Sequence, residues 1–427
     1  MNMRQTTPIP EIFVLWRPQC PLGEKLARRI YSWLRPGNGL GPQVFYRSLP
    51  APEADVKGLP PPLPGEVRPS FQASAKGRPK VSNLQMVLPL IDEHMVADLA
   101  WRHWLGALTT AIPSVTQRVI MPVALDTTAY NMPAALRELN YLRPTGLPLP
   151  VSDDMAGASF ESVVRSLLKQ LTESMCRLML SRPNRSGAVT NRLSVSNESL
   201  PKVTIFLSHA KEDGTIPARR LRDYIYSQTQ LAAFYDENDI AFGSVFSRVI
   251  QDDLDSPDTA ALIAVRSARY ASRSWCRREL SLFRRPRQEN QAGEGVERWR
   301  LYPSLVVEAM EGGKLSAGIP ELGNSSVIRW ADDDKNLEEL IVTTVIRDAM
   351  LASFHSAMGA SIPSKAEQII INWLPDPTTL LHLPTIRSAS EERDVLHPGR
   401  GLSGVELDIL AEFFPKLTFR SFEEVLL

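Results

Sequence analysis

Short apolar runs alternate with longer amphipathic stretches in the first 180 residues of the chain. The runs have the length of buried strands, and the stretches repeat apolar residues at helical spacing. The strands expected here are Glu11–Trp16, Val44–Tyr46, Leu84–Ile91 and Val119–Leu125, and the helices are Leu26–Leu34 and Phe160–Leu180. This alternation predicts an α/β fold in which helices cover a parallel sheet.

The same order returns after residue 200. The expected strands are Val203–Leu207, Ala232–Tyr235, Thr259–Val265, Leu301–Val307 and Ser326–Trp330, and the helices are Ala218–Ser227, Phe246–Leu254, Ser274–Phe283 and Asn336–Ser353. Local sequences match as well, since IFVLW corresponds to IFLSH and LARRIYSWL to ARRLRDYIY. We therefore expect one α/β architecture written twice by divergent duplication.

Two polar, proline-punctuated stretches interrupt this pattern. Pro50–Pro79 lacks apolar periodicity and predicts an exposed loop, which we interpret as a tolerated insertion rather than a functional loop. Ser181–Pro201 indicates an interdomain linker. The expected domains are residues 1–181, a linker at 182–200, a second domain at 201–358 and a small C-terminal α/β segment at 359–427.

That C-terminal segment is too short for an independent doubly wound domain. Thr378–Leu383 and Asp394–His397 are expected as short strands, Val405–Phe414 as a helix, and Leu417–Phe419 as an extended piece. We expect the segment to pack onto the second domain.

Charge and cysteine content exclude several classes of protein. Lys plus Arg and Asp plus Glu both number 48, so the chain is not a globally basic nucleic-acid binder. The three cysteines, Cys20, Cys176 and Cys276, lie far apart and have neither disulfide-framework nor metal-ligand spacing. No apolar run approaches the length of a membrane span, and no signal-peptide pattern is found. We expect a cytoplasmic protein with no bound metal and no membrane partner.

Three motifs after the linker occur in register with the predicted strands and helices. They are IFLSHAKEDG (Ile205–Gly214), FYDENDIAFG (Phe234–Gly243) and SWCRREL (Ser274–Leu280). In this order and spacing, residues 201–355 resemble the TIR (Toll/interleukin-1 receptor) domain, especially its bacterial examples. The resemblance implies a flavodoxin-like fold with a central parallel sheet. The first domain then resembles a degenerate TIR-like domain.

The resemblance also implies function. Some TIR domains recruit other TIR domains, others cleave NAD at its nicotinamide–ribose bond, and many bacterial members act in anti-phage defence. In the enzymatic members the catalytic glutamate lies in a Trp-Cys-x-x-Glu pattern, which places it at Glu279 here. NAD is then a substrate, and no cofactor is implied.

The residues around Glu279 suit that chemistry. Trp275 and Glu279 are four residues apart and share one helix face, so an indole wall lies beside a carboxylate. Because nicotinamide leaves as a neutral base, one carboxylate facing the positive charge on ribose is sufficient. A helical glutamate is otherwise usually a solvated surface charge, and that interpretation stays open. Cys276 is expected to be a packing residue.

Two loops complete the expected site. Ser208, His209 and Lys211 end the first strand, where the resemblance implies the wall of a nucleotide pocket; a turn in which Ser208 bonds its own backbone is the alternative. The acidic loop corresponds to the family's assembly loop, which also gates the site. Its matching residues are Tyr235, Asp236, Asp239 and Gly243.

Phe242 stands where the family often has proline in that loop. An exposed Phe242 would insert into a neighbouring subunit and contribute to its substrate site, whereas a buried one would fold back onto its own core.

The first domain offers no matching carboxylate. A gapless alignment through the central strands places Trp104 at the position of Glu279, whereas matching Trp101 to Trp275 places Leu105 there. We expect this domain to be non-catalytic and to sense, dimerise or hold the second domain inactive.

A basic band runs before, through and after the SWCRREL motif. Its arginines are Arg266, Arg269, Arg273, Arg277, Arg278, Arg284, Arg285 and Arg287. A nucleotide diphosphate or an acidic surface could use them, but no aromatic stacking platform accompanies them, so nucleic acid is not expected as a partner.

The leading hypothesis is an assembly-activated NAD+ glycohydrolase that releases nicotinamide and ADP-ribose or a cyclic isomer. Its expected partners are NAD, further copies of itself, and an upstream sensor protein or nucleotide signal. The alternative is a non-enzymatic adaptor that binds other TIR domains. A third hypothesis is a receptor for a nucleotide derivative in the first domain.

Overall fold

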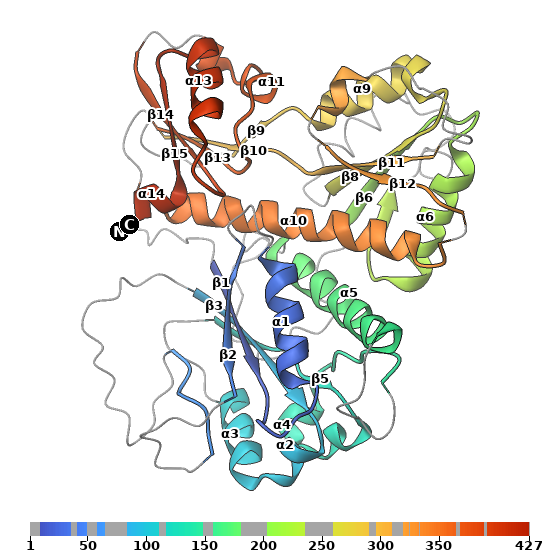
Figure 1. Cartoon of the computed structure of the whole chain (residues 1–427), viewed down its shortest axis with the longest axis vertical. Helices are drawn as coiled ribbons and strands as arrows, with labels where there is room; N and C mark the ends of the chain where they lie inside the picture. Colours follow the sequence, from blue (N-terminus) through green and yellow to red (C-terminus); the bar gives the residue numbers. More distant parts are fainter. Residues whose placement is uncertain are drawn as a thin grey trace. The chain divides into compact units, whose positions relative to one another are not determined.

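The computed structural model divides the chain into two compact units (Figure 1). Unit 1 comprises residues 1–171 and 183–200, and unit 2 comprises residues 172–182 and 201–427. The structure describes residues 9–35, 41–48, 58–64, 83–110, 117–147, 157–180, 203–234, 259–289, 296–309, 319–323, 325–332, 334–363, 368–387 and 391–426.

Unit 1 is a parallel sheet with helices. Its elements are β1 (Ile9–Leu15), α1 (Gly23–Leu34), β2 (Gln43–Arg47), β3 (Asn83–Ile91), α2 (Glu93–Ala97), α3 (Leu99–Thr110), β4 (Gln117–Ile120), β5 (Val123–Ala124) and α4 (Ala134–Arg137). Helix α5 (Ala158–Leu180) belongs to unit 1 up to residue 171 and to unit 2 from residue 172. The strand order is β2-β1-β3-β4, and β5 continues beside β3 after β4 ends. Pro122 lies between β4 and β5 and has no N–H for the ladder, so the one strand expected at Val119–Leu125 is split in two.

Unit 2 begins with a sheet of the same kind. Its elements are β6 (Thr204–His209), α6 (Thr215–Gln228), β7 (Ala232–Phe234), β8 (Thr259–Arg266), the 3₁₀ turn η3 (Tyr270–Ser272), α9 (Ser274–Phe283), β11 (Ser304–Glu308), β12 (Ser326–Arg329) and α10 (Leu337–Ser361). The strands are parallel in the order β7-β6-β8-β11-β12, which is the 2-1-3-4-5 order of flavodoxin-like folds. The predicted α/β fold class is confirmed.

A stacked phenylalanine pair recurs in both sheets. Phe13 and Phe45 are register partners on β1 and β2, and their ring centroids lie 5.0 Å apart. Phe206 and Phe234 are the partners on β6 and β7, at 4.9 Å. In both pairs the ring planes are nearly parallel, 17° apart. Strand order and this shared core contact agree with the expected duplication.

Unit 2 contains a second sheet that draws on two separate parts of the chain. Its elements are β9 (Arg287–Gln288), β10 (Glu297–Arg300), β13 (Ile369–Ile371), α11 (Pro377–Leu380), α12 (Pro384–Arg387), β14 (Arg393–His397), α13 (Gly404–Phe413), β15 (Leu417–Ser421) and α14 (Phe422–Leu426). The order is β15-β14-β13-β10-β9. The segment expected at 359–427 thus supplies three strands, while β9 and β10 lie between α9 and β11.

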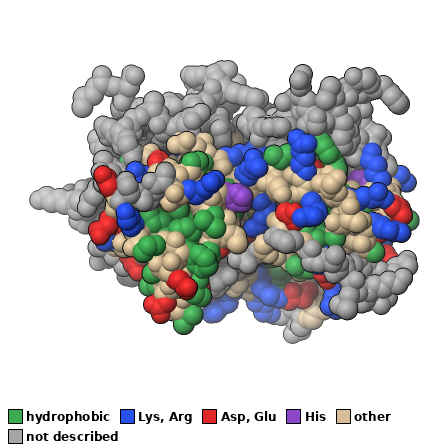
Figure 2. Space-filling model, turned by 90° about the horizontal axis from the view of Figure 1, so that it is seen from above, with side chains coloured by type: hydrophobic (Ala, Val, Ile, Leu, Met, Phe, Trp, Pro, Cys, Tyr) green, Lys and Arg blue, Asp and Glu red, His purple; other side chains and the backbone are tan. Residues whose placement is uncertain are grey.

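The second sheet has its own apolar core, which includes Leu410 and Phe414 from α13 and its C-cap. The exposed side of α13 carries Val405, Ile409 and Phe413, which recur every fourth residue. On the face that Figure 2 presents, hydrophobic side chains occur in several places and gather most densely in one of them.

Two local predictions were wrong. Thr378–Leu383 is not a strand: Asp376 accepts a hydrogen bond from the Thr379 N–H at 2.9 Å, and Pro377 opens α11 at the first helical position. The proline-rich stretch is not wholly an exposed loop, because Leu59 and Leu63 are buried in the core of unit 1. The helix expected at Phe246–Leu254 lies outside the described residues.

Within the part of the chain that the structure describes, no helix is long and apolar enough to cross a membrane.

Candidate functional site

A pocket of about 570 Å³ opens at the carboxyl end of β6 in unit 2. Parallel α/β sheets bind ligands at this edge, where the chain order reverses between the first and third strands. The lining residues come from β6, the loop after it and α9: Phe206, Leu207, His209, Ala210, Lys211, Glu212, Arg273, Trp275, Cys276 and Glu279.

Glu279 presents a buried carboxylate to this pocket. The side chain lies on α9 and is 4% exposed, so it is not the solvated surface charge that a helical glutamate usually is. Its Oε2 accepts a hydrogen bond of 2.6 Å from the Ser208 hydroxyl on β6. Because the donor sits on a central strand, this bond fixes one oxygen of the carboxylate to the sheet.

Tyr270 extends this contact into a relay of three side chains. Its hydroxyl lies 2.7 Å from the Ser208 Oγ. Since Ser208 has one hydroxyl hydrogen and gives it to Glu279, Tyr270 donates to Ser208. Burial raises the pKa of Tyr270 well above its ordinary value, and the nearby Glu279 adds to that shift. The phenol therefore keeps the proton that the relay requires.

An aromatic wall stands beside the carboxylate. Trp275 lines the pocket one helical turn before Glu279, as their four-residue spacing requires. The Arg278 guanidinium lies 5.4 Å from the centre of the Trp275 ring, within the range of a cation–π contact. The indole is thus braced on α9 next to the buried carboxylate.

Cys276 packs against the first strand. Its thiol donates to the His209 carbonyl oxygen at 3.4 Å, and the residue is 4% exposed. This contact agrees with a packing role and ties α9 to β6 behind the pocket.

The charged mouth of the pocket is formed by two loops. Glu212 pairs with Arg273, and its other oxygen lies 3.5 Å from Arg269 Nε. Asp213, in the loop after β6, is bonded to the loop after β8. It accepts hydrogen bonds from the Ser267 hydroxyl at 2.5 Å and from the Arg269 N–H at 2.8 Å.

The structure brings together most of the residues predicted for the site. His209, Lys211, Trp275 and Glu279 line one pocket. Ser208 lies behind Glu279 and spends its hydroxyl on that carboxylate and on Tyr270, so the geometry favours neither the backbone turn nor a direct contact with substrate.

The assembly-loop residues Tyr235, Asp236, Asp239, Phe242 and Gly243 lie outside the described residues, and their roles remain predictions.

Sequence reasoning missed Tyr270 and the pairing of Arg273 with Glu212. Tyr270 lies in the short turn between β8 and α9, and no spacing rule connects it to Ser208, which is 62 residues away. Its only sequence signal is that it follows a buried strand at the edge where Ser208 also lies.

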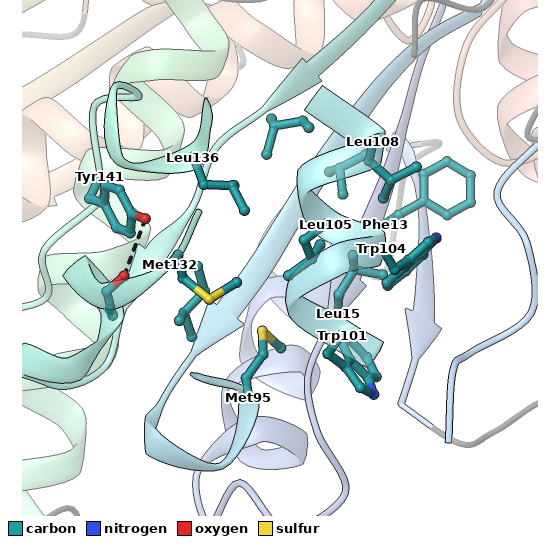
Figure 3. Packing of buried hydrophobic residues seen from close by; sticks show 14 of the residues in the cluster. Phe13, Leu15, Met95, Trp101, Trp104, Leu105, Leu108, Met132, Leu136 and Tyr141 are labelled. Atoms are coloured by element: carbon teal, nitrogen blue, oxygen red, sulfur yellow. Dashed lines mark hydrogen bonds between the residues drawn. The ribbon is translucent and has the colours of Figure 1, made fainter. Parts of the chain in front are cut away.

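Unit 1 has an apolar counterpart of this site. Val87 pairs with Phe13 on β1 as Leu262 pairs with Phe206 on β6. Carried forward without a gap, this register places Leu15, Met95 and Trp104 where unit 2 has Ser208, Tyr270 and Glu279. All three belong to the buried cluster in Figure 3.

The chain was compared with known proteins in three ways. A family model described as TIR domain matches residues 205–340. A search of curated proteins finds no match. Among solved structures, the chain is similar to the C-terminal domain of glucosamine-fructose-6-phosphate aminotransferase from Francisella tularensis at 9% identity, over 82% of this chain and 85% of that one. The TM-score is 0.17, which does not indicate a shared fold.

Proposed function

We propose, from the match of residues 205–340 to the TIR domain model, that unit 2 is an NAD+ glycohydrolase. The TIR family includes both signalling modules and enzymes that cleave NAD. The proposed reaction breaks the bond between nicotinamide nitrogen and ribose C1′. Water supplies the new C1′–O bond, and the products are nicotinamide, ADP-ribose and a proton. A cyclic isomer forms instead where an atom of the adenine attacks C1′.

The observation that carries this proposal is the placement of Glu279. Its carboxylate is 4% exposed, accepts a 2.6 Å hydrogen bond from Ser208, and lines a pocket beside Trp275. Burying a carboxylate costs free energy, and ionisable side chains buried in a pocket are found mostly at functional sites. The Ser208 hydroxyl, held in turn by Tyr270, positions one oxygen of the Glu279 carboxylate at the pocket.

This arrangement suits a transition state with positive charge on ribose. As the C1′–N bond lengthens, the sugar acquires oxocarbenium character and nicotinamide becomes neutral. A fixed carboxylate then gains attraction that it lacks in the ground state, which is the condition for acceleration. The Trp275 ring offers a flat surface on which the leaving base can stack.

Further parts of the proposal rest on the family resemblance. We propose that the protein is cytoplasmic, that self-association through the TIR domain activates it, and that NAD depletion serves anti-phage defence. Unit 1 is proposed to be non-catalytic because Trp104 and its neighbours fill the place of the relay.

The test is NAD turnover by the purified full chain at high protein concentration, with nicotinamide release followed by chromatography. Glu279→Gln keeps the shape of the side chain and removes its charge, so kcat is expected to fall by roughly 10²–10³-fold or more. Glu321→Gln is the matched control, because Glu321 pairs with Arg277 of the same helix and does not line the pocket.

Full activity of Glu279→Gln would contradict the assignment. Absence of turnover in the wild-type chain, even when it is crowded into assemblies, would favour the adaptor hypothesis instead.

A further inference from the structure

At the mouth of the pocket, Arg273 and Arg269 form a site for an anion, and the Glu212 carboxylate occupies it. We call this site the anion seat. Glu212 and Arg273 both line the pocket and pair directly with each other. The second Glu212 oxygen faces Arg269, so one carboxylate is held from two sides by guanidinium groups. Lys211 lines the same mouth. Two guanidinium groups therefore converge on one carboxylate at the mouth of the pocket.

The backbone fixes this seat. Asp213 accepts from the Arg269 N–H and from the Ser267 hydroxyl, which anchors the backbone at Arg269, just before the turn that leads to Arg273. Arg273 is the N-cap residue of α9, a helix of ten residues, and makes no side-chain cap hydrogen bond. The positive end of the helix dipole therefore points to the same place as the arginines. An anion there meets groups that are already oriented.

The ion pair in the seat can be exchanged. The side chains of Arg273 and Glu212 are 50% and 49% exposed. Ion pairs at this exposure contribute little to stability, because water screens them and both side chains lose freedom in forming them. A diphosphate carries more charge than a carboxylate and offers several oxygens to guanidinium forks, so it competes well for the same arginines.

The position of the seat fits a dinucleotide. Arg273 and Glu279 are six residues apart at the start of α9, a rise of about 9 Å along the helix axis. In NAD the diphosphate is joined directly to the ribose whose C1′ bond would be cleaved. A substrate with its ribose at Glu279 therefore carries its diphosphate toward the mouth.

We propose that Glu212 is an internal stand-in for the substrate's diphosphate, which displaces it from Arg273 and Arg269 on binding. The inference rests on the proposed function and assigns two roles that function leaves open. Arg273 selects for nucleoside diphosphates over nucleosides, and Glu212 weakens their binding by competing for the seat.

The test is calorimetric binding of ADP and of adenosine to the full chain, which requires no turnover. Arg273→Ala is expected to weaken ADP binding by about tenfold or more, which is the loss of a charge-assisted contact, and to leave adenosine binding unchanged. Glu212→Gln is expected to tighten ADP binding by roughly three- to tenfold, because the internal competitor loses its charge. Far-UV circular dichroism of each variant confirms that it is folded.

Arg277→Ala is the matched control. Arg277 lies one turn further along α9, is similarly exposed at 48% and pairs with Glu321 outside the pocket. ADP affinity should not change in this variant. The inference is overturned if wild-type chain does not bind ADP, if Arg273→Ala and Arg277→Ala behave alike, or if Glu212→Gln weakens ADP binding.

The outcome also separates the two proposals. ADP binding with the expected pattern but no NAD cleavage supports the seat and counts against the glycohydrolase. The opposite result is NAD cleavage that is lost in Glu279→Gln, with ADP affinity unchanged in Arg273→Ala. That result supports the glycohydrolase and counts against the anion seat.

Discussion

The two units share a sheet order but differ in the side chains at one edge of the sheet, which are polar in unit 2 and apolar in unit 1. Both build parallel sheets in the order 2-1-3-4, and both stack a phenylalanine pair between their first two strands. In unit 2, the edge of the sheet then holds a hydroxyl–hydroxyl–carboxylate relay. In unit 1, the matching positions hold leucine, methionine and tryptophan inside a continuous apolar core. The scaffold is shared, and the polar relay is the difference.

Part of the proline-rich segment packs into the same apolar core of unit 1. Leu59 and Leu63 pack into the core beside Trp104, and the Trp101 Nε1 donates to the Gly58 carbonyl oxygen at 2.9 Å. In unit 2 the edge of the sheet borders a pocket, whereas in unit 1 the matching positions lie in a packed apolar core. The two units thus share strand order and differ in the chemistry of this edge.

The largest expected effect concerns the filled site. Trp104→Ala should destabilise unit 1 by about 3–5 kcal/mol, because it removes a large buried side chain from a packed core. Urea unfolding of the full chain, followed by circular dichroism, should show an early transition. Leu99→Ala on the same helix, at a side chain 63% exposed, should leave the curve nearly unchanged. Equal stability of the two variants would contradict the conclusion that Trp104 fills a packed core in unit 1.

The next effect concerns the relay itself. Ser208→Ala removes the bond that fixes Glu279 and leaves the Tyr270 hydroxyl without its acceptor. We expect kcat for NAD cleavage to fall by about 10–100-fold with little change in KM, since the serine positions a group rather than binding substrate. Ser208→Thr, which retains the hydroxyl on a β-branched side chain suited to a strand, should restore much of the loss. Equal defects in the two variants would indicate a packing role instead.

A smaller effect is expected one step further from the carboxylate. Tyr270→Phe keeps the buried ring and deletes only the donor to Ser208. We expect kcat to fall by less than in Ser208→Ala, on the order of the loss of one neutral hydrogen bond, about 1 kcal/mol or fivefold. Kinetics of both single variants and the double variant measure the coupling. Additive losses would show that the two hydroxyls act independently.

The smallest effect is a pH dependence of stability. The folded-state pKa of Tyr270 is raised, so its contribution to stability is fully present below the unfolded tyrosine pKa of about 10. Above that pH the unfolded chain releases this proton while the folded chain keeps it, and stability falls. The thermal midpoint of the wild type should therefore drop more steeply between pH 9.5 and pH 11 than that of Tyr270→Phe, as approximate bounds around that pKa. Parallel slopes would contradict the assignment.

The sequence predicted the scaffold better than the site. Apolar runs and helical spacing identified most strands and the long helices, because burial imposes those periods locally. α9 was predicted with its observed bounds, Ser274–Phe283. Failures arose where a local rule was overruled, as at Thr378–Leu383, where an N-cap and a proline start a helix within an apolar run.

At the site, the motif indicated Glu279 because its neighbours stand at fixed spacing on one helix. Tyr270 and the Glu212–Arg273 pair depend on contacts between loops and strands that are distant in sequence. No single-sequence period encodes such contacts. Of the two alignments of the first domain with the second, the one that matches Trp104 to Glu279 agrees with the strand register. The one that matches Leu105 to Glu279 does not.

The route of the chain through unit 2 limits how this protein can be divided. After α9, the chain leaves the first sheet to form β9 and β10, returns for β11 and β12, and then leaves again along α10 for the remaining strands. A gene fragment that ends near residue 355 would keep β10 and discard its partner β13. The stretch that matches the TIR domain model, residues 205–340, is therefore not self-contained, because β10 within it pairs with β13 outside it.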